Sequence, residues 1–413
     1  MKARPQPADG DRRSVPSADA RDGRLSRSLS GTNLARAGDY NLRTVLQAIR
    51  LAPGTTRVAI AHQTGLTAAT IANITGRLIE MGLVRVMGRR QGGRGQPPLE
   101  LMVEPDGAFG IGVNIDRDHL TIVTMDLAGE VRSRTTREVA FALPDTVRGF
   151  LRDEMDRAIA SGNIKRDQIL GIGVAIPDDL GRISLPGQPE AYRAWDGTEV
   201  ADLFHGLPWQ VHCDNDAAAA ALGEAEFGTG FDNPTFLYLL VSAGLGGGLV
   251  VDRSYHRGAG NRSGEIGLIP DASAGAAGAT VQDTVSLSAL LRRLEAAGLP
   301  VETVAALDRL EGRAAKIVDH WLDDAVRALT APIVSVNCLI DPDAILIGGR
   351  LPMSLIHRLA EQLNAAMENL PVPSRAPIRP AIMAQDAPAI GAAILPFLDH
   401  LLPSDAILIQ AGR

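Results

Sequence analysis

The segment from Val211 to Leu268 constrains the fold more than any other part of the chain. It places the pair Asn215 and Asp216 at the end of a short apolar run and follows the pair with an Ala-rich stretch typical of a helix. Two further apolar runs are joined through Gly244, Gly246, Gly247 and Gly248. Because glycine permits positive φ and close approach of a ligand to the main chain, this hairpin can cradle a phosphate or the rim of a sugar.

Three polar side chains in this segment can bind hydroxyl groups. Glu265 stands between glycines in Gly264-Glu265-Ile266-Gly267. Asp216 can accept two hydroxyl hydrogens, Asn215 can donate and accept, and Glu265 can accept from the opposite side of a ring. The segment therefore predicts a site for a neutral polyol. The alternative is a glycine cluster that only shapes a turn.

Several motifs occur here in one order, and that order resembles the ROK family, named for repressors, open reading frames and sugar kinases. The residues that carry the resemblance are Asn215-Asp216, Ala219, Ala220, Gly223-Glu224, the glycine turn 244–248, Gly258, Gly260 and Gly264–Gly267. The resemblance implies an α/β fold in which a two-lobed, actin-like ATPase (ribonuclease H-like) body holds a sugar between its lobes. It also implies that Asn215, Asp216 and Glu265 bind the sugar, with Gln282 where the family uses a carboxylate.

Charge is distributed unevenly along the 413 residues, a length that predicts two or three domains. The first 100 residues hold 16 basic and 7 acidic side chains, a net charge of +9, whereas the whole chain has −7, which leaves −16 for the rest. A basic module fits a polyanionic partner that an acidic body would repel. Residues 1–35 are poor in aliphatic side chains and are expected to form a disordered arm.

Residues 36–104 are expected to form a winged helix-turn-helix domain. Apolar positions Leu42, Val45, Leu46 and Ile49 predict one helix from Asn41, which Pro53-Gly54 ends, and a second helix is expected from Arg57 to Gln63. After the turn at Gly65, a third helix is predicted whose inner face is formed by Ile71, Ile74, Leu78 and Met81.

The third helix is the candidate for reading DNA. Thr67 can cap it, while Thr70, Asn73 and Arg77 recur at spacings of three and four and share another, exposed face. In a helix-turn-helix the second helix enters the major groove, where Asn pairs with adenine and Arg with guanine or phosphate. The alternative is a small structural bundle.

Two predicted strands, 83–87 and 99–103, flank a segment rich in Gly and Arg that is expected to form the tip of a wing. Arg89, Arg90 and Arg94 are its candidate DNA contacts, and Arg94 is expected to enter an A/T-rich minor groove. The alternative is an ordinary mobile hairpin. The wing also resembles the Gly-Arg-rich segment of ROK repressors.

The first hairpin of the body, predicted from residue 109, departs from the kinase branch of the family. In ROK kinases this hairpin contacts nucleotide phosphates and a metal ion through an Asp-x-Gly-Gly-Thr pattern. The corresponding positions hold Asn114, Asp116, Arg117 and Asp118. These residues remove the space for phosphates and add negative charge, so we expect no kinase activity, no catalytic residues and no cofactor.

The zinc motif of the family is also missing. Leu268 stands at the position of the family's His, and 271–280 contains no cysteine. A tetrahedral zinc site needs thiolate or imidazole ligands, so none is expected in this segment. The chain has two cysteines, Cys213 and Cys338, too few for a disulfide framework.

The sequence thus predicts a sugar-responsive transcriptional regulator, most directly a repressor of carbohydrate-metabolism genes, with residues 105–413 as its sugar-binding body. Its expected partners are a double-stranded DNA operator, a small sugar or sugar derivative and a second copy, as a homodimer or homotetramer. No apolar run suits a membrane span or signal core, so a cytoplasmic protein is expected. Two alternatives remain: a ROK sugar kinase with an appended DNA-binding domain, and an architectural DNA-binding protein whose body senses nothing.

Overall fold

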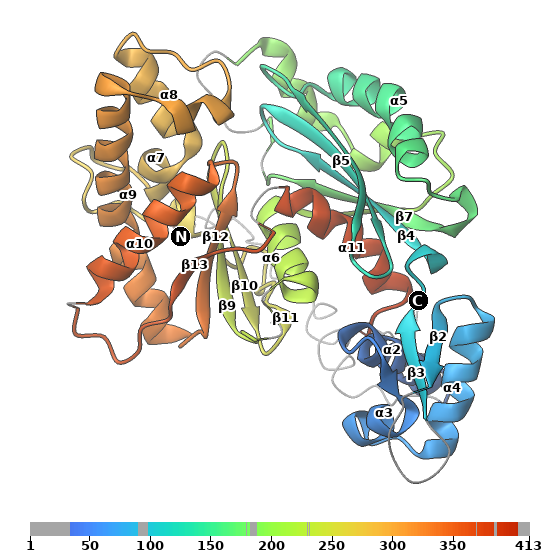
Figure 1. Cartoon of the computed structure of the whole chain (residues 1–413). Helices are drawn as coiled ribbons and strands as arrows, with labels where there is room; N and C mark the ends of the chain where they lie inside the picture. Colours follow the sequence, from blue (N-terminus) through green and yellow to red (C-terminus); the bar gives the residue numbers. More distant parts are fainter. Residues whose placement is uncertain are drawn as a thin grey trace, which may run out of the picture.

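The chain folds into a small N-terminal module and a body of two α/β lobes (Figure 1). The computed structural model describes residues 34–403 except 90–97, 179, 182–187, 229, 231, 369 and 384–385. The expected disordered arm, 1–35, therefore lies almost wholly outside the described residues. Across the part of the chain that is described, none of the helices combines the length and apolar character that crossing a membrane requires.

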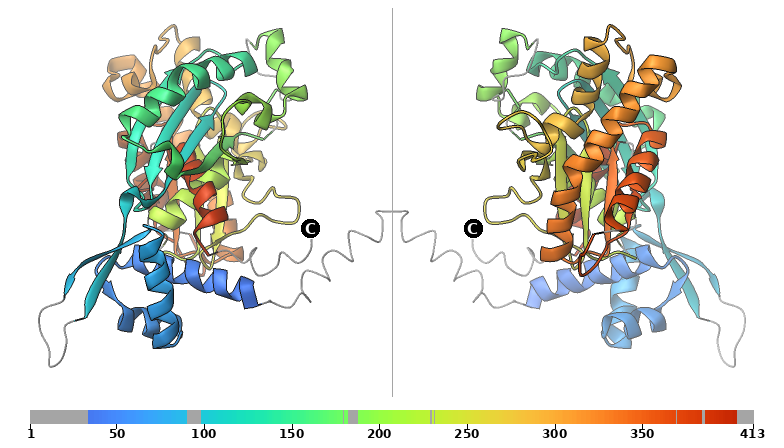
Figure 2. Two further views of the ribbon diagram at one scale, coloured as in Figure 1. Left: turned by 90° about the vertical axis from the view of Figure 1, so that its right-hand side faces the viewer. Right: turned by 90° about the vertical axis from the view of Figure 1, so that its left-hand side faces the viewer.

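The N-terminal module contains three helices and a small antiparallel sheet. The helices are α2 (Leu34–Leu51), α3 (Arg57–Thr64) and α4 (Ala68–Glu80). The strands are β1 (Thr55–Thr56), β2 (Val84–Arg89) and β3 (Leu99–Val103), in the order β1-β3-β2. The expected winged helix-turn-helix is confirmed, although α2 begins seven residues before the expected Asn41. Strands β2 and β3 project from the module in Figure 2.

The core of this module follows the apolar spacing of the sequence with one exception. Ile71 and Leu78 of α4 are fully buried, but Met81 is 48% exposed, because α4 ends at Glu80 and Met81 is its C-cap. The expectation for Met81 was wrong. Thr75 is buried instead: its hydroxyl accepts a hydrogen bond from Arg57 Nε at 2.8 Å and donates to the carbonyl of Ile71, which joins α3 to α4.

The first lobe is a five-stranded mixed sheet in the order β6-β5-β4-β7-β8. Its strands are β4 (Phe109–Ile115), β5 (His119–Asp126), β6 (Val131–Glu138), β7 (Ile169–Ile176) and β8 (Val211–Asn215). Helix α5 (Pro144–Ser161) covers one face, and the short 3₁₀ helices are η1 (Pro105–Gly107), η2 (Arg166–Gln168), η3 (Glu190–Gly197) and η4 (Val200–Phe204).

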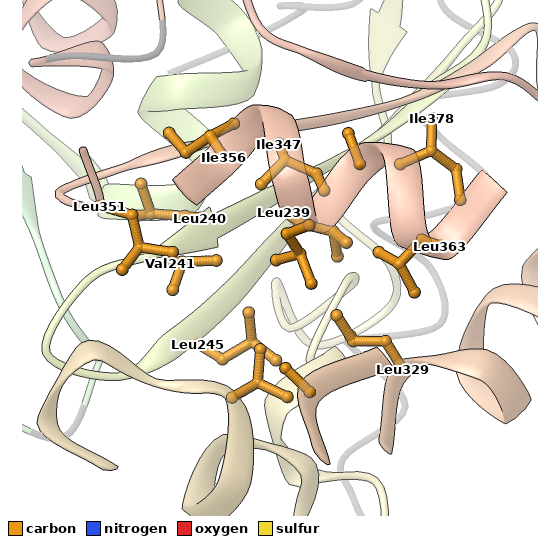
Figure 3. Packing of buried hydrophobic residues seen from close by; sticks show 14 of the residues in the cluster. Leu239, Leu240, Val241, Leu245, Leu329, Ile347, Leu351, Ile356, Leu363 and Ile378 are labelled. Atoms are coloured by element: carbon orange, nitrogen blue, oxygen red, sulfur yellow. The ribbon is translucent and has the colours of Figure 1, made fainter. Parts of the chain in front are cut away.

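The second lobe is another five-stranded mixed sheet, in the order β11-β10-β9-β12-β13. Its strands are β9 (Phe236–Val241), β10 (Leu245–Val251), β11 (Ser254–Tyr255), β12 (Ala344–Gly349) and β13 (Ile378–Pro380). Its helical segments are η6 (Ile266–Leu268), α7 (Val281–Val285), α8 (Leu287–Ala296), η7 (Val304–Arg309), α9 (Gly312–Leu339) and α10 (Met353–Glu368). Leu239, Ile347 and Leu363 pack together in its core (Figure 3).

Two helices, α6 (Asp216–Phe227) and α11 (Ala387–His400), pack against each other between the two sheets. Helix α11 lies on β4 and β7, and α6 lies on β10. Glycines make this packing close: a methyl group at Gly112 or Gly173 would overlap a backbone carbonyl of α11, and one at Gly391 would overlap the carbonyl of Ala219. The glycines of the apolar strands therefore set the distance between the layers.

The N-terminal module is docked on the body rather than tethered to it. Leu42, Val45 and Leu46 of α2 belong to the same buried apolar cluster as Ile394 and Phe397 of α11. Arg43 Nη1 of α2 donates to the carbonyl of Asp399 at 2.7 Å, at the C-terminal end of α11. Burial of this continuous cluster fixes the module against α11.

Candidate functional site

The first candidate site is the exposed face of α4 in the winged helix. The hydroxyl of Thr67 caps α4 by accepting from the backbone N–H of Thr70 at 3.2 Å, and the two hydroxyls lie 2.9 Å apart. Asn73 and Arg77 are exposed, whereas Thr70 is half-buried. The face that the sequence assigned to DNA is thus open at Asn73 and Arg77, while the Thr70 hydroxyl is engaged with the cap.

Only the two strands of the wing lie within the described residues. Arg89 ends β2, opposite Leu99 of β3. Arg90 and Arg94 lie outside the described residues. Val86 and Met87 of β2 are exposed, so this strand presents apolar side chains to solvent.

The second candidate site is a cavity of about 90 Å³ between the lobes, called the small cavity below. All four sequence-predicted sugar residues line it, namely Asn215, Asp216, Glu265 and Gln282. They come from the start of α6, the residue before η6, and α7. Topology brings them together, because β8 ends beside the glycine turn between β9 and β10.

Asn215 and Asp216 take different roles at the start of α6. Asn215 is the N-cap, and its Oδ1 accepts from the N–H groups of Ala217 at 3.0 Å and Ala218 at 3.2 Å. Because that oxygen is occupied, Asn215 offers its amide N–H to a ligand and no longer the double role expected from sequence. Asp216 Oδ1 accepts from Ala217 N at 2.8 Å.

Asp216 is the most perturbed carboxyl group of the small cavity. Only 8% of the residue is exposed. Burial, reinforced by the neighbouring charge of Asp116, raises the pKa of Asp216 from 3.8 to about 7. Near neutral pH this side chain therefore exists in both protonation states and can donate or accept a hydrogen bond from a hydroxyl group.

Glu265 and Gln282 face the cavity from the second lobe. Glu265 Oε1 accepts from Arg262 Nε at 3.0 Å, so its charge is balanced by that ion pair. Gln282 lies in the first turn of α7, and Leu268, at the family's His position, lines the cavity but is 46% exposed.

The sequence did not assign Arg117 and Asp178 to this cavity, although both line it from the first lobe. Arg117 was expected only in the hairpin that contacts phosphates in ROK kinases. In the structure, residues of this hairpin line the small cavity and also a second cavity described below. Asp178 follows the Pro turn after β7, and its distance in sequence from Asn215 hides the contact. Parallel pairing of β7 with β8 was the one signal available, because it places both strand ends at one edge.

The glycines of the turn 244–248 serve packing as well as ligand access. Gly244 and Gly246 line the small cavity. A methyl group at Gly247 would overlap the backbone of Gly264, and one at Gly248 would contact the side chain of Ala221 at 2.5 Å. The expected ligand cradle therefore extends over Gly244 and Gly246, while Gly247 and Gly248 bring the Gly264 turn and α6 against the sheet.

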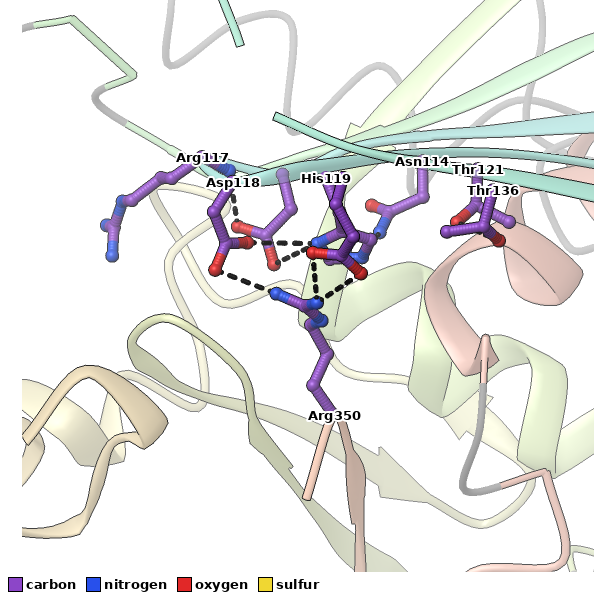
Figure 4. Close-up of polar contacts among 9 residues, drawn as sticks. Asn114, Arg117, Asp118, His119, Thr121, Thr136 and Arg350 are labelled. Atoms are coloured by element: carbon purple, nitrogen blue, oxygen red, sulfur yellow. Dashed lines mark hydrogen bonds and ion pairs between the residues drawn. The ribbon is translucent and has the colours of Figure 1, made fainter. Parts of the chain in front are cut away.

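A second cavity of about 320 Å³, called the large cavity below, lies between the lobes beside the Gly349 turn. The first hairpin of the body closes one side of it. Asn114 Nδ2 and His119 Nε2 lie 3.1 Å apart, and His119 Nδ1 lies 3.1 Å from Asp118 Oδ1 and 3.6 Å from Asp116 Oδ2 (Figure 4).

The charges of this hairpin point toward Arg350 of the second lobe. Arg350 forms an ion pair with Asp118 at 2.7 Å and donates to Glu138 at 2.6 and 2.7 Å. Burial opposes ionisation of Asp118, but the hydrogen bond with His119 and the charge of Arg350 together lower its pKa. The hairpin is thus an acidic cluster neutralised by side chains of the protein.

Metal-ligating side chains come together at two places among the described residues. One group is Asp116, Asp118 and His119, and the other is His212, Asp399 and His400. Neither includes the segment 271–280 in which the family's zinc motif would lie. Asp271 there is bound to Ser273 and Thr284, which orders the loop through hydrogen bonds.

Known proteins resemble both parts of the chain. Residues 110–397 match the ROK family, and residues 39–85 match a family described as winged helix-turn-helix DNA-binding. The uncharacterized protein y4fQ of Sinorhizobium fredii is 30% identical over 86% of this chain and 90% of its own length.

Curated regulators match over a shorter region. The xylose repressor of Caldicellulosiruptor bescii is 28% identical, over 51% of this chain and 53% of the repressor. The dual regulator NagC of Escherichia coli is 28% identical, over 52% of this chain and 53% of NagC. This chain therefore spans about half the length of these two relatives.

Solved structures establish the fold. A ROK family transcriptional regulator, described as a homolog of the E. coli MLC protein, has a TM-score of 0.64 at 21% identity and covers 91% of this chain and 100% of its own. A ROK glucokinase from Streptomyces griseus has a TM-score of 0.53 at 20% identity, over 70% of this chain and 99% of its own. The match to the ROK family covers well over half of the sequence, and we conclude that this protein belongs to the ROK family.

Proposed function

We propose that this chain is a sugar-responsive, DNA-binding transcriptional regulator, most directly a repressor of carbohydrate-metabolism genes. The observation that carries the proposal is that α6 contacts the small cavity at one end and the winged helix at the other. The names of two relatives, a xylose repressor and the regulator NagC, support a sugar effector and an operator as partners.

Residues 36–104 act as the DNA-binding domain in this proposal. Helix α4 enters the major groove, where the exposed Asn73 and Arg77 reach base edges or phosphates. Thr67 and Thr70 lie at the N-terminus of α4, which favours a phosphate. Arg94 of the wing is assigned to the flanking minor groove, and Arg89 and Arg90 are further candidate DNA contacts.

Residues 105–413 act as the sugar-binding body. The small cavity offers an amide donor from Asn215, a carboxyl group poised between its two protonation states in Asp216, and acceptors in Glu265 and Gln282. This donor and acceptor set suits the hydroxyl groups of a sugar. Asp216 comes from the first residue of α6, so sugar binding acts directly on that helix.

The other end of α6 is held by the winged helix. Arg50 of α2 donates to Glu226 Oε2 at 2.6 Å and to the carbonyl of Glu226 at 2.9 Å, and its guanidinium lies 4.2 Å from the ring centroid of Phe227. Gln47 donates to the same carboxylate at 3.0 Å. A shift of α6 caused by the sugar therefore acts on α2 through Glu226.

The body is proposed to bind sugar without phosphorylating it. Phosphoryl transfer depends on positioned phosphates and neutralised charge. The hairpin that contacts phosphates in ROK kinases here presents Asp116 and Asp118, and the charge of Asp118 is already matched by Arg350. Nucleotide phosphates would meet carboxylates rather than N–H donors.

A sugar kinase is the second candidate, and one observation favours it. The pKa of Asp216, raised to about 7, suits a general base acting on a sugar hydroxyl. A coupled assay of ADP release with glucose, xylose, N-acetylglucosamine and N-acetylmannosamine separates the two functions. We expect no sugar-dependent ADP release, and turnover above the rate of Asp216→Ala would establish the kinase.

The regulatory function is tested by binding. A thermal-shift screen of monosaccharides, disaccharides and sugar phosphates identifies the effector, and DNA selected from random duplexes supplies the operator. Asp216→Ala is expected to bind the operator like the wild type but to lose the effect of the sugar. If Asp216→Ala responds to the sugar with an unchanged midpoint concentration, the sugar does not bind in the small cavity.

A further inference from the structure

Arg350 connects the two lobes, and the proposed function gives this connection no role in how the lobes are held. It follows β12 in the second lobe, and its backbone N–H donates to the carbonyl of Val241 at 2.8 Å, which fixes it to that sheet. Its side chain, 14% exposed, crosses to Asp118 and Glu138 of the first lobe (Figure 4). One guanidinium thus bridges the lobes beside the large cavity.

The two partners of Arg350 lie near each other at one end of the sheet of the first lobe. Asp118 lies in the turn between β4 and β5, and Glu138 ends β6, opposite His119 in the sheet. His119 holds Asp118 from the other side at 3.1 Å. Asp118 is therefore fixed within the first lobe, and Arg350 is the cation that the second lobe brings to Asp118 and Glu138.

The same turn also forms part of the small cavity. Asp116 lines both cavities, and Arg117, next to Asp118, lines the small one. Glu265 and Gln282 face them from the second lobe. The position of the turn against the second lobe consequently sets the width of the small cavity.

We propose that Arg350 is a positioning residue that holds the two lobes closed through Asp118 and Glu138. In ROK kinases this hairpin contacts nucleotide phosphates and metal, so a bridge built from side chains lets the present body close without either. This role in lobe closure does not depend on whether the body binds a sugar. Its effect on sugar affinity rests on the proposed function.

The native cysteines give a direct readout of lobe separation. Cys213 of β8 lies in the first lobe and Cys338 of α9 in the second, both are exposed, and the sequence contains no others. Spin labels on both report their distance by pulsed electron paramagnetic resonance in the full chain. Although the residue is exposed, desolvation of its thiol and the charge of Asp214 raise the pKa of Cys213 to about 11, so labelling there is slow and is checked by mass.

Removing the guanidinium is expected to open the lobes. Arg350→Ala should shift the label distance to longer values and broaden it, measured without sugar or DNA. Arg350→Lys keeps the charge but loses the two-pronged contact, so its shift should be smaller. Glu138→Gln, whose side chain is 65% exposed in the wild type, should fold normally and shift the distance in the same direction.

The matched control is Arg358→Ala. Arg358 pairs with Asp319 at 2.6 Å, an ion pair that lies wholly within the second lobe. Its loss should leave the label distance unchanged. The proposal is overturned if Arg350→Ala and Glu138→Gln keep the wild-type distance, or if Arg358→Ala shifts it as much as Arg350→Ala does.

Sugar titration provides a second and separable readout. D-xylose and N-acetylglucosamine are the probes. For whichever sugar the wild type binds, the sugar concentration at the midpoint of the thermal-shift titration should be about tenfold higher for Arg350→Ala, because closing the opened lobes adds a cost to binding. Equal sugar affinities of the wild type and Arg350→Ala would contradict the link to the small cavity. If no sugar in the wider screen shifts the wild type, the proposed function fails, while the distance measurement still decides the role of Arg350.

Discussion

Asp216 is a buried carboxyl group at the first position of a helix, an arrangement in which burial and the helix act in opposite directions. The helix N-terminus stabilises the charged form. Burial and the charge of Asp116 destabilise it more strongly, since the pKa rises to about 7. The ionised side chain is therefore a cost to the fold that a sugar hydroxyl donating to it would reduce.

This cost predicts how stability depends on pH. The unfolded chain ionises Asp216 near 3.8, whereas the folded protein keeps the proton up to about pH 7. The folded state thus binds the extra proton between these values, and stability from this group is full below the lower value and lost as the pH rises through 7. The slope is at most about 1.4 kcal/mol per pH unit.

Asp216→Asn removes the titration and is the test. The melting temperature of the mutant minus that of the wild type should grow from pH 4 to pH 7 and level off above pH 7. Asp145→Asn, which changes an exposed carboxylate on α5, is the control and should show no such trend. A difference for Asp216→Asn that stays flat across this range would mean that the carboxyl group ionises at its ordinary pKa.

The sequence identified four residues that lie together in the structure, while their binding of a sugar stays a prediction. The motif order placed Asn215, Asp216, Glu265 and Gln282 in one cavity, and all four line it. It did not anticipate that the Asn215 oxygen caps α6, because capping depends on where the helix begins. Nor could it assign Arg117, whose direction depends on the fold of the turn.

At the scale of elements, the crossing of α6 and α11 depends on glycine. The Cα of Gly391 lies against α6, and a side chain there would overlap the carbonyl of Ala219. Gly391→Ala should destabilise the protein by about 1–3 kcal/mol, because the helices must separate to admit the methyl group. Chemical denaturation measures this change.

Gly275→Ala provides the control for this substitution. Gly275 has no atom within 4 Å of an added methyl group, so its replacement should have little effect. Equal stability of Gly391→Ala and the wild type would show that the crossing relaxes readily.

The contact between Arg50 and the end of α6 suggests a mutation that separates sugar binding from DNA release. Arg50→Lys keeps a cation beside Glu226 but loses the paired contacts and the stacking on Phe227. Sugar affinity should stay at the wild-type value, while the sugar-induced change in operator affinity should fall about tenfold, within the usual range of coupling energies.

Operator titrations with and without the effector measure the loss of coupling in Arg50→Lys. Arg148→Lys, on the distant α5, is the matched control and should respond fully. An undiminished response in Arg50→Lys would place the coupling elsewhere.

Element-level prediction was governed by periodicity and glycine. The winged helix and the hairpin of β4 and β5 were expected from apolar spacing and turn residues, and both are present. The start of α2 was missed by seven residues, because 34–40 lacks the apolar repeat that marks a buried face. Met81 was misplaced because its spacing fits the helix but the chain turns there, with Gly82 at positive φ.

At the scale of the whole molecule, the proposed function requires two copies on one operator. A helix-turn-helix dimer binds half-sites about one or two helical turns apart, in multiples of ~34 Å. Gel-shift titrations with one and with two half-sites should differ strongly in affinity, and sedimentation of the complex should give two chains per operator. Equal affinity for both DNAs would indicate binding as a monomer.

The position of Gly223 in α6 has a mechanical consequence. The helix crosses α11 there, where Gly223 and Gly391 face each other. Asp216 stands seven residues before this point and Glu226 three residues after it, so at 1.5 Å per residue the two arms measure about 10 and about 5 Å. If α6 tilts about the crossing, it behaves as a lever with an off-centre fulcrum. The end at Asp216 then travels about twice as far as the end held by Arg50. A large displacement at the sugar therefore becomes a smaller displacement with a larger force on the DNA-binding module.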